Sequence, residues 1–156
     1  MKRTQRIQEG SMTLENMKKM LQDHDLCVLA TESGGKPLCS LMGYVCDEDC
    51  RHMYMTTAKN STKWRNLMEN PSVSCLVDTR ERHGRNRRNE VQALTVAGVC
   101  EPPESEAEEA HIRSRLLEAH PQLKVFLEDS DCGIIAVRIL SFLLLDGLTD
   151  ARYVRV

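Results

Sequence analysis

Residues 53–71 read MYMTTAKNSTKWRNLMENP, and this stretch carries the pattern that decides the fold. It begins as a short strand that ends in Thr56 and Thr57, and a polar turn then opens an amphipathic helix. Ser61, or the asparagine before it, is a suitable N-cap. The backbone N–H groups at such a helix start attract anions, and Lys63 adds a point charge. The turn therefore predicts a seat for a phosphorylated cofactor, although an ordinary capped helix with solvated polar residues fits the spacing equally well.

Several pieces of the chain, taken in order, resemble the pyridoxamine 5'-phosphate oxidase-like family. They are the hydroxyl pair, the Ser-x-Lys turn, the short helix, Asn70-Pro71 and the apolar strand at 73–77. The later strand at 93–98 continues the resemblance, which spans about residues 14–154. It implies a mainly β fold with flanking helices, namely a six-stranded antiparallel Greek-key split barrel of the FMN-binding type. It also implies a homodimer that holds flavin at its interface.

Composition and charge favour one globular domain. A chain of 156 residues with a net charge of -2 has no global excess of positive charge for nucleic acid or an anionic membrane. We expect a flexible N-terminal segment at residues 1–12 and a single domain at residues 13–156. No apolar run follows the basic N-terminus, and the longest apolar stretch is too short to span a bilayer, so we expect neither a signal peptide nor a membrane segment. Seven cysteines, an odd number, suggest reduced thiols and a cytoplasmic location.

The order of elements supports a barrel independently of the resemblance. Short turns join the predicted strands, and few helices lie between them, which favours an antiparallel barrel over a doubly wound sheet. Strands are expected at 26–31, 38–46, 51–57, 72–79, 91–100 and 133–145, with an edge strand at 151–155. Helices are expected from a Thr13 cap to about Asp25, behind a Ser105–Glu108 capping box, and around residues 123–127. A charged loop is expected at 80–89.

The resemblance also implies which residues hold the cofactor. They are Leu41, Met42, Thr56, Thr57, Ser61, Thr62, Lys63 and Gln92. Lys63 would pair with the FMN phosphate, and the hydroxyls would bind phosphate or ribityl oxygens. The family often has an arginine where Thr62 stands, so one cation is missing there. Gln92 is the candidate for a family glutamine, although its spacing to Gly98 differs by one residue.

A flavin performs its own redox chemistry, so the resemblance implies an FMN-dependent oxidoreductase acting on a small molecule without naming a catalytic residue. NAD(P)H is a candidate electron donor. The C-terminal sequence DGLTDARYVRV lacks the histidine of the substrate motif in true pyridoxamine phosphate oxidases, so we do not expect that activity. The alternative is a non-enzymatic flavin- or haem-binding or sensing protein on the same barrel.

A dense group of arginines follows the strand at 72–79. It comprises Arg80, Arg82, Arg85, Arg87 and Arg88. Arginine forks suit phosphates and carboxylates, so these residues are candidates for an anionic ligand or for contact with a partner subunit. A solvated loop is the alternative, and nucleic acid is disfavoured because aromatic residues for base stacking are scarce.

Cys46, Cys50 and His52 are spaced like part of a metal site. A structural zinc normally has four ligands, and the sequence offers no clear fourth. We therefore expect no metal here.

Overall fold

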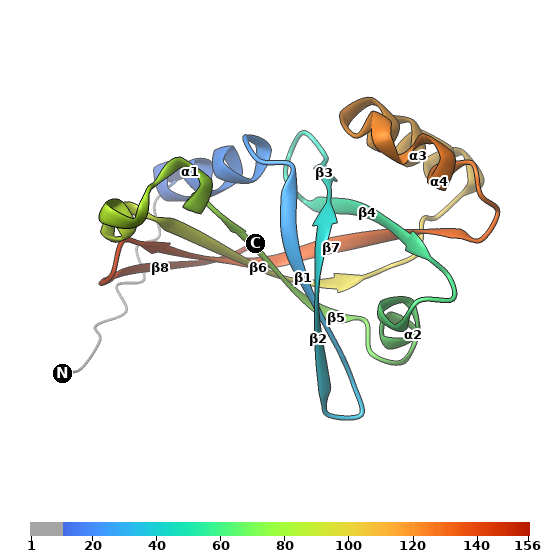
Figure 1. The fold of residues 1–156 in the computed structure, drawn as a ribbon, viewed down its shortest axis with the longest axis horizontal. Coiled ribbons are helices and arrows are strands. Elements are labelled where there is room, and N and C mark those ends of the chain that lie inside the picture. Colours follow the sequence, from blue (N-terminus) through green and yellow to red (C-terminus); the bar gives the residue numbers. More distant parts are fainter. Residues whose placement is uncertain (1–10) are drawn as a thin grey trace.

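The computed structural model describes residues 11–156, so residues 1–10, which make up most of the predicted flexible segment, lie outside the description. Eight strands form one antiparallel sheet in the order β2-β1-β5-β6-β7-β4-β3, with β8 paired to β7 (Figure 1). The strands are β1 (Leu26–Ser33), β2 (Lys36–Gly43), β3 (Val45–Cys46), β4 (His52–Ala58), β5 (Ser72–Asp78), β6 (Gln92–Cys100), β7 (Cys132–Asp146) and β8 (Asp150–Arg155). The helices are α1 (Ser11–Gln22), α2 (Thr62–Glu69), η1 (Arg80–Arg82), η2 (Arg85–Glu90), α3 (Glu106–Ala119), η3 (Pro121–Leu123) and α4 (Lys124–Leu127).

The mainly β split-barrel architecture is as predicted, with a strand count of eight in place of six. The difference comes from the two-residue strand β3 and from β8, which pairs only with β7. The chain of β7 is long enough to pair with β4 at its start, with β6 over most of its length and with β8 at its end. The sheet therefore curls around this one strand.

The β1–β2 hairpin turns as the sequence predicts. Gly34 and Gly35 are its two central residues, and both have positive φ values, 58° and 75°. Such a turn matches the right-handed twist of the two strands and favours glycine at both positions. In Figure 1 the hairpin extends away from α1, α3 and α4, and its end lies beside α2, where Asn70 Nδ2 donates to Glu32 Oε2 at 2.8 Å.

The core lies on the concave face of the sheet. In β1 and β5 every second side chain is buried, as expected for strands with one covered face. A bulge in β7 at Leu140 changes which residues face inward, so that Val137 and Phe142 both reach the core. The helix α1 adds Met17 and Leu21 to this core.

A second apolar cluster holds α3 and α4 against the outer face of β4 and β7. Ile112 and Leu116 of α3 pack on Tyr54, Ile134 and neighbouring residues. These helices lie together beside β4 in Figure 1. The outer face of β1, β5 and β6 has no such helix among the described residues.

Four local predictions differ from the structure. The helix α1 begins at Ser11, so Thr13 is a buried residue in its first turn and does not cap it. The predicted strand 38–46 is split at Tyr44, whose N–H donates to Asp25 O and whose hydroxyl donates to Leu21 O at 2.6 Å. The loop after β5 contains the two short helices η1 and η2.

The fourth difference is in the predicted capping box of α3. Ser105 Oγ accepts from Glu108 N at 3.1 Å, as predicted. The Glu108 carboxylate accepts from Glu104 N, however, and not from Ser105 N as a capping box requires.

In residues 11–156 no helix combines the length and apolarity needed to cross a bilayer.

Candidate functional site

A cavity of about 390 Å³ opens where β2, β4, the start of α2 and the η3–α4 segment meet. Its lining residues are Leu41, Met42, Gly43, Thr56, Thr57, Ala58, Ser61, Lys63, Leu123 and Phe126. Six of the eight cofactor residues expected from the sequence are therefore together in one place. The volume lies within the usual range for small-molecule sites.

Three polar side chains form one end of this cavity. Lys63 Nζ donates to Thr57 Oγ1 at 3.3 Å, and Thr57 Oγ1 lies 3.2 Å from Ser61 Oγ. Thr57 is buried, whereas the other two side chains reach from the first turn of α2. Among the described residues no carboxylate forms an ion pair with Lys63, so its charge is available to an anion.

The start of α2 adds backbone donors at the same end. Ser61 is the N-cap, and its hydroxyl accepts from Trp64 N at 3.2 Å. The N–H groups of Thr62 and Lys63 have no acceptor in the described part of the chain. Unpaired N–H groups at a helix start carry partial positive charge and bind anions. The two donors and the lysine therefore point to an anion site.

The two remaining threonines of the motif are less available to a ligand. Thr56 Oγ1 donates to Gly133 O at 3.0 Å and also contacts Cys132, so its hydrogen-bonding capacity is used within the protein. Thr62 Oγ1 accepts from Arg65 Nη2 at 3.2 Å on the surface, and Thr62 does not line the cavity. Arg65 thus lies beside the position where the family often has an arginine.

The other end of the cavity is apolar. Met42 is buried, whereas the Leu41 side chain is 72% exposed. Leu123 and Phe126, from the segment after α3, complete this end. Sequence reasoning missed both residues, because nothing in local spacing shows that a segment 80 residues further along the chain folds back onto β2.

Gly43 at this end is supported from behind by a buried histidine. A Cβ on Gly43 would lie 3.0 Å from His120 Cε1, and His120 Nε2 lies 3.0 Å from Tyr44 O. The imidazole therefore fixes the backbone that forms one wall of the cavity. Histidine in this position was also not foreseen from the sequence.

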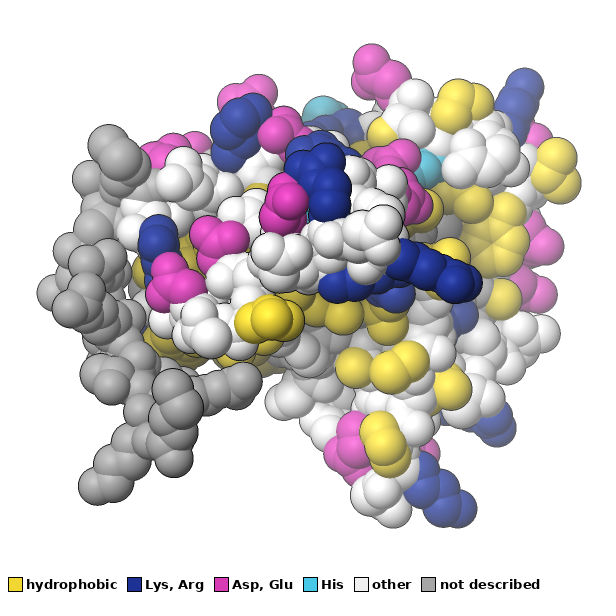
Figure 2. All heavy atoms as spheres, turned by 60° about the vertical axis from the view of Figure 1, so that its left-hand side comes forward, with side chains coloured by type: hydrophobic (Ala, Val, Ile, Leu, Met, Phe, Trp, Pro, Cys, Tyr) yellow, Lys and Arg dark blue, Asp and Glu magenta, His cyan; other side chains and the backbone are white. Residues whose placement is uncertain are grey.

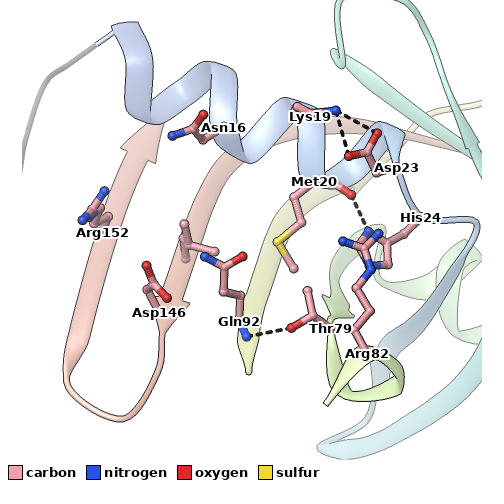
Figure 3. A pocket seen from close by; sticks show the side chains of 11 residues that line it. Asn16, Lys19, Met20, Asp23, His24, Thr79, Arg82, Gln92, Asp146 and Arg152 are labelled. Atoms are coloured by element: carbon pink, nitrogen blue, oxygen red, sulfur yellow. Dashed lines mark hydrogen bonds and ion pairs between the residues drawn. The ribbon is translucent and has the colours of Figure 1, made fainter. Parts of the chain in front are cut away.

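Gln92 lies elsewhere in the chain. It pairs with Asp146 at the end of β7, whereas Thr57 pairs with Gly133 at the beginning of the same strand. Its side chain lines a separate cavity of about 240 Å³ between α1, η1 and β6–β8 (Figure 3). Arg82 and Arg152 line this second cavity at opposite ends. A single chain therefore does not bring Gln92 to the cavity that contains Lys63.

The five arginines after β5 do not converge on one site. Arg80 donates to the Asp78 carboxylate at 2.9 Å, and this hydrogen bond raises the pKa of Arg80. Arg87 pairs with Glu90 and lowers the pKa of that carboxyl. Arg82 lines the second cavity, and Arg85 and Arg88 are exposed. On the described part of the face in Figure 2, acidic side chains lie among many of the basic ones, and a few basic side chains lie together near the centre.

Cys46, Cys50 and His52 do not share a ligand geometry. Cys46 Sγ and Cys50 Sγ are 3.9 Å apart, but His52 Nδ1 lies 2.9 Å from Asp47 Oδ2. Across residues 11–156 no group of three or more histidine, cysteine or acidic side chains is placed to hold a metal ion.

Comparison with known proteins identifies the family of the sequence. The model of the family described as "Pyridoxamine 5'-phosphate oxidase" matches residues 13–139, which is most of the chain. A comparison with curated proteins found no match.

Three solved structures illustrate the range of proteins with this fold. A heme binding protein from Mycobacterium smegmatis is 20% identical with a TM-score of 0.77, and the match covers 89% of this chain and 57% of that one. HutZ, the heme storage protein from Vibrio cholerae, is 18% identical with a TM-score of 0.67, covering 87% and 95%. A FAD-binding protein from Mesorhizobium loti is 19% identical with a TM-score of 0.67, covering 83% and 91%. At these identities the likeness shows the fold alone.

Proposed function

The chain belongs to the pyridoxamine 5'-phosphate oxidase family, and on that premise we propose that it binds flavin mononucleotide in the cavity of Lys63. The cofactor would serve an oxidoreductase reaction on a small molecule. The observation that carries this proposal is the two-ended cavity: one end has a lysine, hydroxyls and unpaired N–H groups, and the other is apolar. FMN has the same division between its phosphate and its ring.

The residues fit the parts of the cofactor in a definite order. Lys63 Nζ and the N–H groups at the start of α2 would bind the phosphate, where charge-assisted hydrogen bonds are strongest. Thr57 and Ser61 would donate to phosphate or ribityl oxygens. The backbone of Leu41 and Met42 would lie along the ring, opposite Phe126. When bound, FMN supplies hydride and electron transfer, while the protein supplies binding, orientation and exclusion of water.

The cavity also bears on the haem alternative. Haem iron needs an axial ligand, usually from histidine, cysteine, methionine or tyrosine. Of the described residues that line the cavity, Met42 alone belongs to this group, and its side chain is buried toward the core. The nearby His120 is turned to Tyr44 O behind Gly43. We therefore favour flavin over haem, and keep haem as an outcome of the test.

We further propose that two copies associate through the uncovered outer face of the sheet. One cross-strand row on this face crosses β2, β1, β5, β6, β7 and β8, in the order Leu41, Val28, Leu76, Thr95, Leu143 and Tyr153. Five of these six residues are apolar or aromatic. Leu41 lines the Lys63 cavity. Together with Leu26 and Leu76, it also lines a different hollow, on the outer face of the sheet. The proposed interface is thus continuous with the proposed cofactor site.

A second copy would also give a role to residues that are remote in one protomer. Gln92 and Arg82 lie at the opposite end of the barrel from Lys63. Association of two sheets would allow these groups to approach the partner's flavin, as the resemblance implies for Gln92. The seven free thiols suit a reducing compartment, which supports a cytoplasmic location.

The first experiment measures FMN affinity by quenching of flavin fluorescence, in parallel with the absorbance spectrum of the purified protein. Lys63→Ala should weaken FMN binding by about tenfold to a hundredfold, because a charged hydrogen bond to phosphate is lost. Lys59→Ala is the matched control, since it removes the same charge four residues away, outside the cavity. Its affinity should match that of the unaltered protein at equal salt.

The remaining outcomes decide between the alternatives. Flavin reduction by NADPH or NADH with multiple turnovers would support an oxidoreductase, whereas stable FMN binding without turnover would support a sensing role. An intense Soret band with no retained FMN would favour haem. Equal FMN affinities of the two lysine variants would show that Lys63 does not bind the phosphate.

A further inference from the structure

Cys46 and Cys50 form a close pair of thiols that do not line the Lys63 cavity. Their sulfur atoms are 3.9 Å apart, at the end of β3 and in the turn that follows it. Cys50 Sγ also lies 3.7 Å from Lys18 O of α1, and Arg115 of α3 donates to Cys46 O at 2.6 Å. The pair therefore lies where two helices meet the β3–β4 turn.

The turn holds Cys50 in an uncommon conformation. Cys50 has a φ of 52°, the only positive value of a non-glycine residue among residues 11–156. Three hydrogen bonds to Asp47 fix the turn: its carbonyl accepts from Cys50 N, and its carboxylate accepts from Arg51 N and His52 N. The left-handed region is disfavoured for a residue with a Cβ. The sequence therefore has a cysteine, next to another cysteine, at a position where glycine or asparagine would be less strained.

The two thiols differ in the way that a nucleophilic and a resolving cysteine differ. Cys46 is partly exposed, and the hydrogen bond that Cys50 donates to it lowers the pKa of Cys46. Cys50 is 2% exposed, and the same hydrogen bond, together with burial, raises its pKa. A partly exposed thiol whose pKa is lowered, next to a buried one, is the arrangement found in redox-active pairs.

We propose that Cys46 and Cys50 are a reversible dithiol–disulfide pair oxidised by hydrogen peroxide. The Cys46 thiolate attacks one peroxide oxygen, the O–O bond breaks, and the leaving hydroxide takes a proton to become water. Cys46 is then a sulfenic acid. The deprotonated Cys50 attacks the Cys46 sulfur, the S–O bond breaks, and a second water leaves as the S–S bond forms. Two thiols and one peroxide thus give one disulfide and two waters.

The remaining cysteines provide internal comparisons. Cys27 and Cys75 are also neighbours, but both are buried, so neither is partly exposed as Cys46 is. Burial raises the pKa of Cys100, which has no thiol neighbour in the described structure. Cys39 is exposed on β2 and alone. The proposal therefore predicts that an intramolecular disulfide forms only between Cys46 and Cys50, and it does not rest on the flavin proposal.

The test uses the full chain with Cys39→Ser, which removes the exposed single thiol from the peptide that contains the pair. The protein is treated with hydrogen peroxide, unfolded in the presence of an alkylating reagent, and analysed by peptide mass spectrometry. Cys46 and Cys50 should lose reactivity toward alkylation together, with an intact-mass decrease of about 2 Da. Their loss should be about tenfold faster than that of Cys100, and a dithiol reductant should reverse it.

A second variant distinguishes a pair from two independent thiols. In Cys50→Ser, Cys46 should stop at the sulfenic acid and become trappable with dimedone, and no disulfide should form. The proposal is overturned if, in the Cys39→Ser protein, Cys46 passes to sulfinic acid while Cys50 remains alkylatable. It is also overturned if Cys100 oxidises before either member of the pair, or if the only disulfides are between chains.

Discussion

Gly133 lies directly against the indole ring of Trp64. A methyl group on Gly133 would come within 2.5 Å of Trp64 Cη2, well inside contact distance. This contact joins the first residues of β7 to α2, the helix whose first turn carries Lys63. Gly133 O also accepts from Thr56 Oγ1. The position of the proposed phosphate site thus depends on a glycine that is 70 residues away in the sequence.

We expect Gly133→Ala to displace α2 by forcing the indole outward. Overpacking of this kind should lower the free energy of unfolding by about 1–3 kcal/mol and weaken FMN binding as well. Chemical denaturation and flavin fluorescence titration would measure the two effects. Gly84→Ala is the control, because a methyl group there meets no atom within 4 Å. An unchanged Gly133→Ala protein would mean that the Trp64 contact does not position α2.

The adjacent threonines of the motif should respond differently to loss of their hydroxyl groups. Thr57→Val removes a group that faces Lys63 in the cavity, so FMN affinity should fall by about tenfold. Thr56→Val removes a hydrogen bond to Gly133 O, so the free energy of unfolding should fall by about 1 kcal/mol with a smaller change in affinity. Affinity titrations and denaturant midpoints of both variants check this. Equal losses of affinity would show that both hydroxyls face the ligand.

The proposed dimer should depend on the outer face of the sheet. Leu76 occupies the middle of the cross-strand row, between Val28 and Thr95. Leu76→Lys should shift the protein toward monomer, because a charge in an apolar interface is left without a partner. Light scattering after size exclusion gives the molar mass. Val125→Lys is the matched control, since Val125 is 82% exposed on α4, away from this face. A dimeric Leu76→Lys protein would place the interface elsewhere.

Stability at alkaline pH should depend on Tyr44. Burial raises the pKa of Tyr44 above its ordinary 10.0, and its hydroxyl donates to Leu21 O. Above pH 10 the unfolded phenol loses its proton and the folded one keeps it, so the unfolded state binds fewer protons. Stability is therefore fully present below pH 10 and falls above it, by up to about 1.4 kcal/mol per pH unit from this group.

Tyr44→Phe isolates this effect. The variant should be about 1 kcal/mol less stable at pH 8, because a buried hydrogen bond is lost. Its stability should then decline less than that of the unaltered protein between pH 10 and 11. Urea denaturation at each pH measures both quantities. Parallel declines in the two proteins would mean that Tyr44 ionises in the folded state.

Local sequence was sufficient for most of the strands and for one end of the candidate site. Alternating burial in β5, the two glycines of the β1–β2 turn and the Ser61 cap are all properties of a few adjacent residues. Thr57 and Lys63 lie within one turn and one helix start, so their contact needs no long-range information.

Tertiary structure decided the rest, because it depends on which strands become neighbours. The family resemblance implied a site that included Gln92, but β6 and β4 pair with opposite ends of β7, so a single chain holds Gln92 and Thr57 roughly 40 Å apart along that strand. The same strand pairing places Gly133 against Trp64 and directs the Thr56 hydroxyl to Gly133 O. The tertiary structure also places the arginines at separate sites. Chain order and periodicity determine the elements, whereas register and strand order determine which side chains share a cavity.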